Sequence, residues 1–227
     1  MKNIVILTGA GISVESGIQT FRGQHGLWNG YDIEKVASPE GWKSDPELVL
    51  DFYNKRRQEL KTVQPNKAHY ALAELENHHA VSIVTQNVDD LHERAGSTDV
   101  IHLHGELLKA RSEVNSNLII PWDKNLNLGD LGPDKKQLRP HIVWFGEAVP
   151  LMDKAIKTVS EADLLIIIGT SLQVYPAANL MHFCPDDCDI YYIDPQPSEV
   201  ASKRIHIIPQ KATLGIPKLI NTLKLKH

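Results

Sequence analysis

The sequence predicts an α/β fold, a Rossmann-like doubly wound parallel sheet with a small inserted subdomain. Apolar runs without alternation are typical of strands that are buried on both faces, and such runs recur along the chain. They are Ile4–Leu7, Ala80–Val84, Asp163–Ile168 and Ile190–Ile193. Segments whose apolar residues recur at helical spacing separate them, and this alternation favours a parallel sheet covered by helices.

Three helices are expected from the residues that begin them. Asp45 is suited to accept hydrogen bonds at the N-terminus of the first helix, with Pro46 at its first position. Asn66 has the same role in the second helix, and Pro150 begins the third. The residues that recur at helical spacing are Val49, Phe52, Tyr53, Arg56 and Leu60 in the first helix, Ala68, Ala71, Leu72 and Leu75 in the second, and Met152, Ala155, Ile156 and Val159 in the third.

We expect a single domain over residues 1–227. Its Rossmann-like core comprises about residues 1–30, 80–109 and 140–227. Residues 31–79 form a helical insert, and residues 110–139, with short apolar pieces among turn residues, form a second insert. Long segments without a regular pattern inside a compact domain are usually functional or form a subdomain.

Composition and charge exclude several classes of protein. Hydrophobic residues make up 42% and charged residues 23% of the chain, as in globular proteins with a sizeable core. The net charge of −4 gives no reason to expect nucleic acid or a membrane as a partner. The apolar runs are much shorter than the ~20 residues of a membrane span, and no signal peptide is expected after Met1. We therefore expect a soluble, cytoplasmic globular protein. We also expect a monomer.

Two glycine turns follow predicted strands. Gly9 and Gly11 come directly after the first strand, where glycines bring backbone N–H groups close to a pyrophosphate. The dinucleotide fingerprint requires a third glycine where this chain has Val14, so a purely structural turn is the alternative. Gly169-Thr170-Ser171 repeats the pattern after a later strand. Two such turns in one sheet favour a nucleotide that lies across a crevice.

Polar residues end another strand and continue into a histidine pair. Gln86, Asn87 and Asp89 suit a ribose or a carboxamide, although Asn87 or Asp89 as a helix cap is the alternative. His102 and His104 share one face by alternation, so their spacing does not distinguish them. An imidazole suits a general base at neutral pH, but a structural role is the alternative for either histidine.

Together these motifs resemble the sirtuin family, the NAD-dependent protein lysine deacylases. The segments that carry the resemblance are Gly9–Ser13, Ser16–Ile18, Phe21-Arg22, Thr85–His92, Ala95-Gly96, His104–Glu106, Val143–Glu147 and Gly169–Ser171. They stand in the family's order and cover nearly the whole chain. The resemblance implies one catalytic domain that consumes NAD as a co-substrate and acts on acyl-lysine proteins.

The resemblance also implies residue roles. NAD would be bound by Gly9, Ala10, Gly11, Ile12, Ser13, Glu15, Phe21, Arg22, Trp28, Gln86, Asn87, Val88, Asp89, Gly169, Thr170, Ser171, Asp194, Pro195, Gln196 and Ala212. The catalytic residues would be Asn87, Asp89 and His104, with His104 as the general base for a ribose hydroxyl. The substrate peptide would pair, strand-like, with Val143, Phe145, Gly146 and Glu147. Asp194 replaces an asparagine that the family usually has, and its carboxylate can still bind a ribose hydroxyl.

The reaction that the resemblance implies has a clear chemical logic. An acyl-lysine amide is a poor electrophile, and the anomeric carbon of NAD that carries nicotinamide is a better one. Attack by the amide oxygen expels nicotinamide, and the base then lets the neighbouring ribose hydroxyl take the acyl group. NAD is consumed, and the products are nicotinamide and O-acyl-ADP-ribose.

Tyr53 and Arg56 refine the expected substrate. They lie three residues apart on a predicted helix and so share a face. The pair resembles the Tyr-x-x-Arg of sirtuins that remove acidic acyl groups, because a guanidinium binds a succinyl or malonyl carboxylate bidentately. A solvated Arg56 beside a core Tyr53 is the alternative. Arg57 points about 100° further round the helix. Acetyl groups remain possible substrates.

The second insert departs from the family pattern. Most sirtuins have two cysteine pairs with zinc spacing there, but residues 110–139 contain neither Cys nor His. Cys184 and Cys188 come after Gly169-Thr170-Ser171, and two cysteines make neither a disulfide framework nor a four-ligand zinc site. We expect a subdomain without zinc. A small apolar core would replace the metal, formed by Leu118, Ile119, Ile120, Trp122, Leu126 and Leu131.

Two other functions stay open. No zinc would align one wall of the cleft, and a misaligned wall would slow the reaction or change the acceptor. The alternatives are an NAD glycohydrolase or ADP-ribosyltransferase, and a weakly catalytic sensor of NAD or ADP-ribose. Asn87, Asp89 and His104 argue against a sensor, which needs no base. Tyr53 and Arg56 argue against a glycohydrolase, which needs no acyl pocket.

Overall fold

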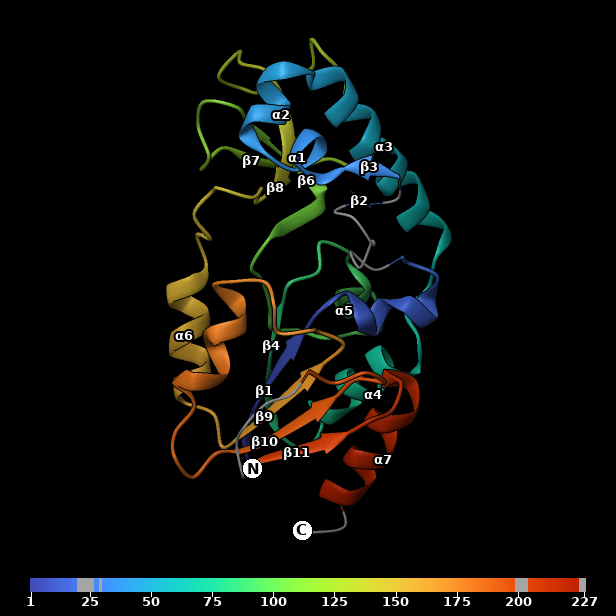
Figure 1. Cartoon of the computed structure of the whole chain (residues 1–227), viewed down its shortest axis with the longest axis vertical. Coiled ribbons are helices and arrows are strands. Elements are labelled where there is room, and N and C mark those ends of the chain that lie inside the picture. The colour runs from blue at the N-terminus through green and yellow to red at the C-terminus, as the bar shows by residue number, and fades with distance from the viewer. Residues whose placement is uncertain (20–26, 29, 199–203, 225–227) are drawn as a thin grey trace.

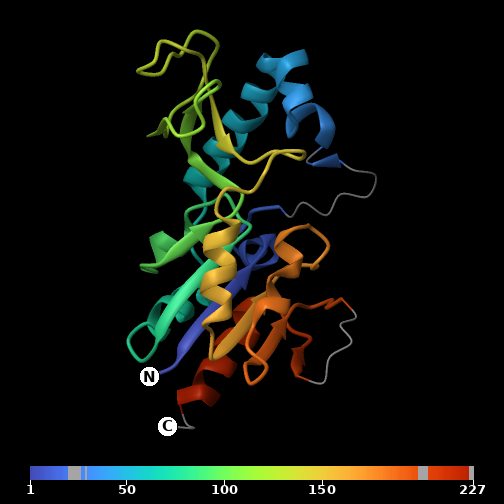
Figure 2. The same cartoon turned by 90° about the vertical axis from the view of Figure 1, so that its left-hand side faces the viewer.

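The computed structural model describes residues 1–19, 27, 28, 30–198 and 204–224. Figure 1 shows two parts stacked along the long axis: a large parallel sheet with its helices, and above it a smaller part with helices and short strands. Figure 2 shows the same division from the side. Phe21 and Arg22, two of the expected cofactor contacts, lie outside the described residues.

The large sheet has six parallel strands in the order β11-β10-β9-β1-β4-β5. Their bounds are β1 Asn3–Thr8, β4 Ala80–Thr85, β5 Val100–His102, β9 Leu164–Ile168, β10 Asp189–Ile193 and β11 Ile205–Ile208. Numbered in chain order within this sheet, the strands run 3-2-1-4-5-6, the doubly wound Rossmann order. Four strands coincide with the predicted apolar runs, whereas β5 and β11 are too short or too polar to be recognised that way.

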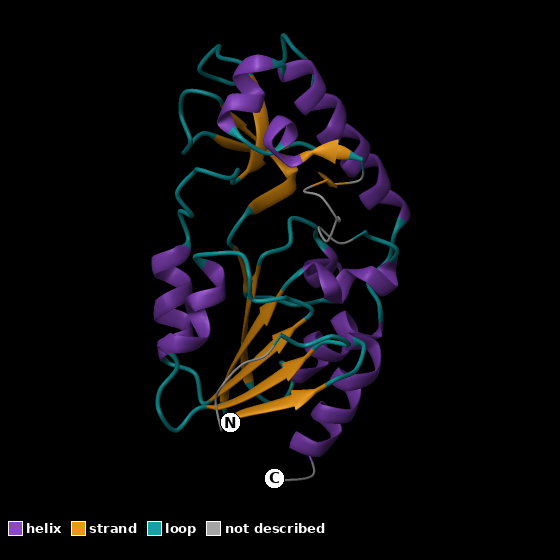
Figure 3. Ribbon diagram, in the orientation of Figure 1, coloured by secondary structure: helices purple, strands orange, loops and turns teal. Residues whose placement is uncertain are grey.

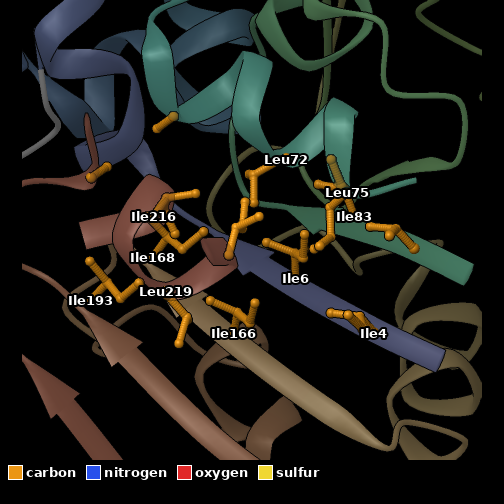
Figure 4. Close-up of a cluster of buried hydrophobic side chains, with 14 of the residues drawn as sticks. Ile4, Ile6, Leu72, Leu75, Ile83, Ile166, Ile168, Ile193, Ile216 and Leu219 are labelled. Atoms are coloured by element: carbon orange, nitrogen blue, oxygen red, sulfur yellow. The ribbon is translucent and has the colours of Figure 1, made fainter. Parts of the chain in front are cut away.

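Both faces of the sheet are covered by helices (Figure 3). Alternate residues of β1 point to opposite faces, so Ile4 and Ile6 join one core while Val5 and Leu7 join the other. On the first face lie α4 (Lys67–Leu75) and α7 (Ala212–Lys224), whose side chains meet β1 in Figure 4. On the second face lie α6 (Met152–Ser160) and the 3₁₀ helix η2 (Ala177–Phe183). The short helix α5 (Leu91–Ala95) follows β4.

The smaller part consists of helices, a two-stranded hairpin and a three-stranded antiparallel sheet of order β7-β6-β8. Its elements are β2 Leu27–Trp28, β3 Tyr31–Asp32, α1 Ile33–Val36, α2 Pro39–Ser44, α3 Pro46–Thr62, β6 Gly105–Ser112, β7 Ile119–Pro121 and β8 Leu138–Ile142. As expected, Asp45 caps α3 by accepting a hydrogen bond from the Leu48 N–H, 3.0 Å away. Asn66 caps α4 in the same way, and the His69 imidazole completes a capping box there.

The boundaries of the two parts differ from those expected. Helix α4 lies on the large sheet, because Ala68, Leu72 and Leu75 form a stripe as apolar as the strands beneath it. The helical insert therefore ends with α3. Strands β6 and β8 pair with each other outside the large sheet, so residues 105–109 and 140–142 belong to the smaller part.

The expected small core of residues 110–139 forms only in part. Leu126 is buried against Leu50 of α3 and Leu138 of β8, with Ile120 and Trp122 packed beside them. The prediction was wrong for Ile119 and Leu131, which are 41% and 56% exposed. The helix supplies part of the apolar surface, so the insert is stabilised against α3 and not by its own side chains alone.

Candidate functional site

The two glycine turns meet where β1 and β9 lie side by side, at the switch point of the doubly wound sheet. Gly11 N–H donates to the Gly169 carbonyl at 2.8 Å. A Cβ on Gly11 would lie 2.6 Å from the Gly169 Cα, and Gly169 has a φ of +60°. Both positions therefore require glycine, for close approach and for backbone conformation.

A cavity of about 250 Å³ opens above these turns. Eleven of the residues expected to bind NAD line it: Gly9, Ala10, Gly11, Glu15, Gln86, Gly169, Thr170, Ser171, Asp194, Pro195 and Ala212. Tyr192 supports the second turn, because its hydroxyl donates to the Thr170 carbonyl at 2.8 Å. The Asp194 carboxylate is buried and accepts the Gln196 N–H at 2.8 Å. Ile12 and Gln196 do not line this cavity: Ile12 is buried, and Gln196 is exposed.

A second cavity, of about 240 Å³, adjoins the first, since both are lined by Ala10, Gln86 and Val174. It brings together Ser13, Asn87, Val88, Asp89 and His104 from segments far apart in the chain.

Hydrogen bonds order the polar side of this second cavity. Ser13 Oγ donates to Asp89 Oδ2 at 3.0 Å, and Asn87 Nδ2 donates to Ser13 Oγ at 3.3 Å. Asp89 Oδ1 also accepts the Leu91 N–H at 3.2 Å, next to Asp90 at the N-cap of α5, so this local hydrogen bond and a place in the cavity coexist. Burial raises the pKa of Asp89 to about 6, although the Leu91 and Ser13 hydrogen bonds oppose the shift. Asp89 is thus a carboxylate that ionises close to neutral pH.

The contacts of His102 and His104 distinguish them, although the sequence did not. His104 Nδ1 faces the Gln86 carbonyl at 3.1 Å, and a carbonyl only accepts, so Nδ1 carries the proton. The lone pair of neutral His104 is therefore on Nε2. Burial lowers the pKa of His104, which keeps the ring neutral and basic at physiological pH. His102 instead faces acceptors with both nitrogens, the Asn87 carbonyl at 3.0 Å and Glu93 Oε1 at 2.7 Å.

A third cavity, of about 200 Å³, continues from the second past Tyr53, Val88 and Asp89 to Arg56. Tyr53 is buried, and its hydroxyl accepts the Trp144 indole N–H at 3.0 Å, which leaves the phenol O–H as a donor. The Arg56 side chain is 11% exposed and lies 3.4 Å from Glu59 Oε2. Burial lowers the pKa of Arg56, and Glu59 opposes this.

Arg57, one residue further along α3, has a different environment. It is fully buried, and its Nε donates to the Leu107 carbonyl at 3.0 Å. Arg57 therefore ties α3 to β6, while Arg56 lines the third cavity.

The segment expected to pair with a substrate peptide leaves β8 and forms a turn at the rim of the second cavity. Val143 and Phe145 line the rim, where the Phe145 N–H donates to the Ala37 carbonyl at 3.0 Å. Gly146 has a φ of +88° in the turn. Glu147 forms ion pairs with Arg111 and Arg139 at 3.0 and 2.8 Å, so its carboxylate links the turn to β6 and β8.

Several lining residues were missed by the sequence analysis. Val174 separates the first two cavities, and Tyr175 and Pro176 line the second. They lie in the loop that begins with Gly169-Thr170-Ser171, so the argument that ligands bind beyond strand ends applies to them too. Lys211 lines the first cavity just before Ala212.

Neither a metal centre nor a membrane segment is found in the part of the chain that the structure describes. No three or more His, Cys, Asp or Glu side chains gather there as metal ligands would. Cys184 and Cys188 are free, buried thiols in the core against α6. None of the described helices has the length and apolarity to cross a membrane.

Comparison with known proteins agrees with this geometry. A family model described as the Sir2 family matches residues 9–176. A Helicobacter pylori protein named NAD-dependent protein deacylase is 67% identical over 196 residues, which cover 86% of each chain. A Bacteroides thetaiotaomicron protein of that name is 51% identical over 226 residues, covering 96% of this chain and 97% of that one.

Solved structures give the same result. A Sir2 homologue in complex with NAD superimposes with a TM-score of 0.88 at 40% identity, covering 98% of this chain and 90% of that chain. A Sir2 protein bound to an acetylated peptide superimposes with a TM-score of 0.81 at 28% identity, covering 98% and 93%.

Proposed function

The chain belongs to the Sir2 family and is an NAD-dependent protein deacylase, and we propose that it prefers acidic acyl groups, succinyl and malonyl, on lysine. The observation that carries the preference is the third cavity, where Tyr53 and Arg56 lie beyond Asp89 and His104. A lysine side chain that enters past Phe145 would present its acyl group in that direction.

The three adjoining cavities suit the two substrates. The first has a floor of closely packed backbone, because a Cβ on Gly9 would lie 2.8 Å from the Gly169 carbonyl oxygen, and such a floor suits the phosphates and adenosine of NAD. The second presents the Asn87 amide, the Ser13 hydroxyl and the Asp89 carboxylate, which suit a ribose and a carboxamide. Bound NAD supplies an anomeric carbon from which nicotinamide can leave.

The protein's own groups then have defined tasks. Ser13 and Asn87 hold Asp89 in place, and Asp89 provides negative charge where positive charge develops on the ribose. His104 Nε2 accepts the proton of a ribose hydroxyl, and the Gln86 carbonyl holds the ring in the required tautomer.

Arg56 and Tyr53 suit a terminal carboxylate for electrostatic reasons. A guanidinium with 11% of its side chain exposed is poorly hydrated, so an anionic ligand gains more there than it would in water. Arginine binds a carboxylate through two parallel hydrogen bonds, and the Tyr53 O–H can add a third. An acetyl group has no terminal carboxylate for these two side chains to bind.

The test is release of nicotinamide from NAD with succinyl-lysine peptide, acetyl-lysine peptide or no peptide. We expect release that depends on the succinyl peptide, with O-succinyl-ADP-ribose formed in equal amount. Release without peptide would assign the chain to the glycohydrolases, and NAD binding without release would assign it to the sensors.

Arg56→Met separates acyl preference from general activity. We expect at least a tenfold loss of kcat/KM for the succinyl peptide and less than a threefold change for the acetyl peptide. Lys55→Met is the matched control, since Lys55 is exposed and pairs with Asp51 at 2.8 Å on another face of α3. Equal losses on both peptides in Arg56→Met would contradict the assignment.

We also propose that the subdomain holds no zinc. In support, residues 110–139 lack Cys and His, and Leu126 is anchored to α3 by packing and hydrogen bonds. Elemental analysis of the purified protein tests this, and one zinc per chain would contradict it.

A further inference from the structure

His102 is buried between the polar loop after β4 and helix α5, outside the reacting groups. Its Nδ1 faces the Asn87 carbonyl and its Nε2 faces the Glu93 carboxylate. Because both partners only accept hydrogen bonds, both ring nitrogens carry protons and the ring is an imidazolium. The 2.7 Å distance to Glu93 is typical of a charge-assisted hydrogen bond.

The Asn87 carbonyl, which His102 binds, belongs to a backbone segment in which every carbonyl from residue 86 to residue 88 accepts a hydrogen bond. Three successive carbonyls accept one hydrogen bond each: Gln86 from His104, Asn87 from His102 and Val88 from the Leu107 N–H at 2.8 Å. The segment carries Asn87 and Asp89 into the second cavity. Without His102, the central carbonyl of the three would lose its hydrogen-bond partner in a buried place, and the Asn87 peptide would no longer be held in this position.

We propose that His102, held as an imidazolium by Glu93, is a positioning residue that fixes the Asn87 peptide and thereby the Asn87 amide and the Asp89 carboxylate around NAD. The inference rests on the proposed roles of Asn87 and Asp89. It assigns to His102, the first histidine of the pair, a function that neither spacing nor alternation indicates.

The charge of His102 has a second effect. Its positive charge lowers the pKa of Asp89 and so opposes the effect of burial. Burial also opposes the charge on His102, but the hydrogen bond and charge of Glu93 raise its pKa. Other charged or titratable groups that face this pair are Glu106, Lys109, Asp90 and His92. Removing the Glu93 charge therefore makes Asp89 harder to ionise.

Four variants separate the hydrogen bond from the charge. His102→Leu removes both, whereas the side-chain amide of His102→Asn can still donate to the Asn87 carbonyl. Glu93→Gln keeps an oxygen and removes the charge, and Glu76→Gln is the control, since Glu76 binds Thr98 at 2.7 Å away from the cavities. Asn87→Ala tests the proposed function itself.

Kinetics with NAD and an acyl-lysine peptide over pH 5.5–9 provide the readout. We expect His102→Leu to lower kcat/KM for NAD at least tenfold with less than a twofold change in KM for the peptide. We expect His102→Asn to retain most of the original kcat/KM for NAD above pH 8. We expect Glu93→Gln to move the acid limb of the profile to higher pH and Glu76→Gln to leave it in place.

The outcomes are distinguishable. If Asn87→Ala retains full activity, the role in the proposed function that is assigned to Asn87 fails, and the premise of the inference fails with it. If Asn87→Ala is inactive while His102→Leu lowers only the melting temperature, with an unchanged profile and unchanged KM for NAD, His102 is merely structural and the inference is overturned.

Discussion

The Gln86 carbonyl oxygen lies 3.1 Å from Nδ1 of His104, and this contact decides which nitrogen of the ring is basic. It leaves the Nε2 lone pair on the neutral ring, in a cavity that also contains Asn87 and Asp89. The two strand ends that supply Gln86 and His104 are neighbours in the sheet, so the sheet itself sets the tautomer.

His104→Asn should remove the base and keep a donor for the Gln86 carbonyl. We expect deacylation to fall at least 100-fold, as general-base losses typically do, while NAD affinity changes less than threefold. Single-turnover kinetics and calorimetric titration with NAD measure the two effects. A near-normal rate would remove His104 from the catalytic residues.

Gly169→Ala should disrupt the contact between the two glycine turns. Its Cβ would lie 2.4 Å from the Ile12 nitrogen and 2.6 Å from the Gly11 carbonyl carbon, besides occupying a φ of +60°. Gly129→Ala is the matched control, with a φ of +91° but nothing within 4 Å of its Cβ.

Urea denaturation and NAD titration measure both glycine variants. We expect the free energy of unfolding of the Gly129 variant to fall by about 1–2 kcal/mol and its affinity for NAD to stay unchanged. The Gly169 variant should lose more stability and bind NAD at least tenfold more weakly. Equal behaviour of the two would show that steric contact at the switch point is unimportant.

Asn54→Ala should loosen the insert that lacks zinc ligands. The Asn54 amide donates to the Leu126 carbonyl at 2.9 Å and accepts the Leu126 N–H at 2.8 Å, so it pairs with the loop backbone as a strand would. We expect a loss of about 2 kcal/mol in the free energy of unfolding, because the partners are partly buried. Gln58→Ala, which breaks the exposed contact to Asn125, should change stability by less than about 0.5 kcal/mol. Hydrogen exchange at Leu126 should rise only in the Asn54 variant.

His69→Gln should reduce the sensitivity of the fold to acid. Burial lowers the pKa of His69 from 6.5 to about 4, so the unfolded chain takes up a proton that the folded chain does not. Stability is therefore lost as pH falls through 6.5, and His69 accounts for about 2 kcal/mol between pH 8 and pH 5. Gln retains an acceptor for the Asn66 N–H, which His69 Nδ1 binds at 3.3 Å, and does not titrate. Urea denaturation at pH 8 and pH 5 should show that the free energy of unfolding falls less between these pH values in the variant than in the original protein. An equal fall in both would exclude His69 as a cause of the acid sensitivity.

Local pattern predicted much of the fold and the general place of the site. Ile4–Leu7 and Leu164–Ile168 are continuously apolar because their strands are buried on both faces, so they are recognisable without any tertiary contact. Asp45 and Asn66 cap their own helices, which is also a local interaction. Since parallel strands all end at one edge, the residues after them indicated where the cavities lie.

What the sequence by itself determined was therefore the periodicity, the caps and the set of side chains that reach one edge of the sheet. Only the tertiary structure decided their partners. His102 and His104 are equivalent in the alternation of the sequence. They differ in the structure because Glu93 of α5 binds the His102 ring, whereas the His104 ring lines the second cavity. Arg56 and Arg57 differ in the same way, by a cavity on one side of α3 and the Leu107 carbonyl on the other. Hydrogen bonds and charges act over a few ångströms in space, so residues distant in sequence set the tautomer, the charge and the accessibility of a side chain.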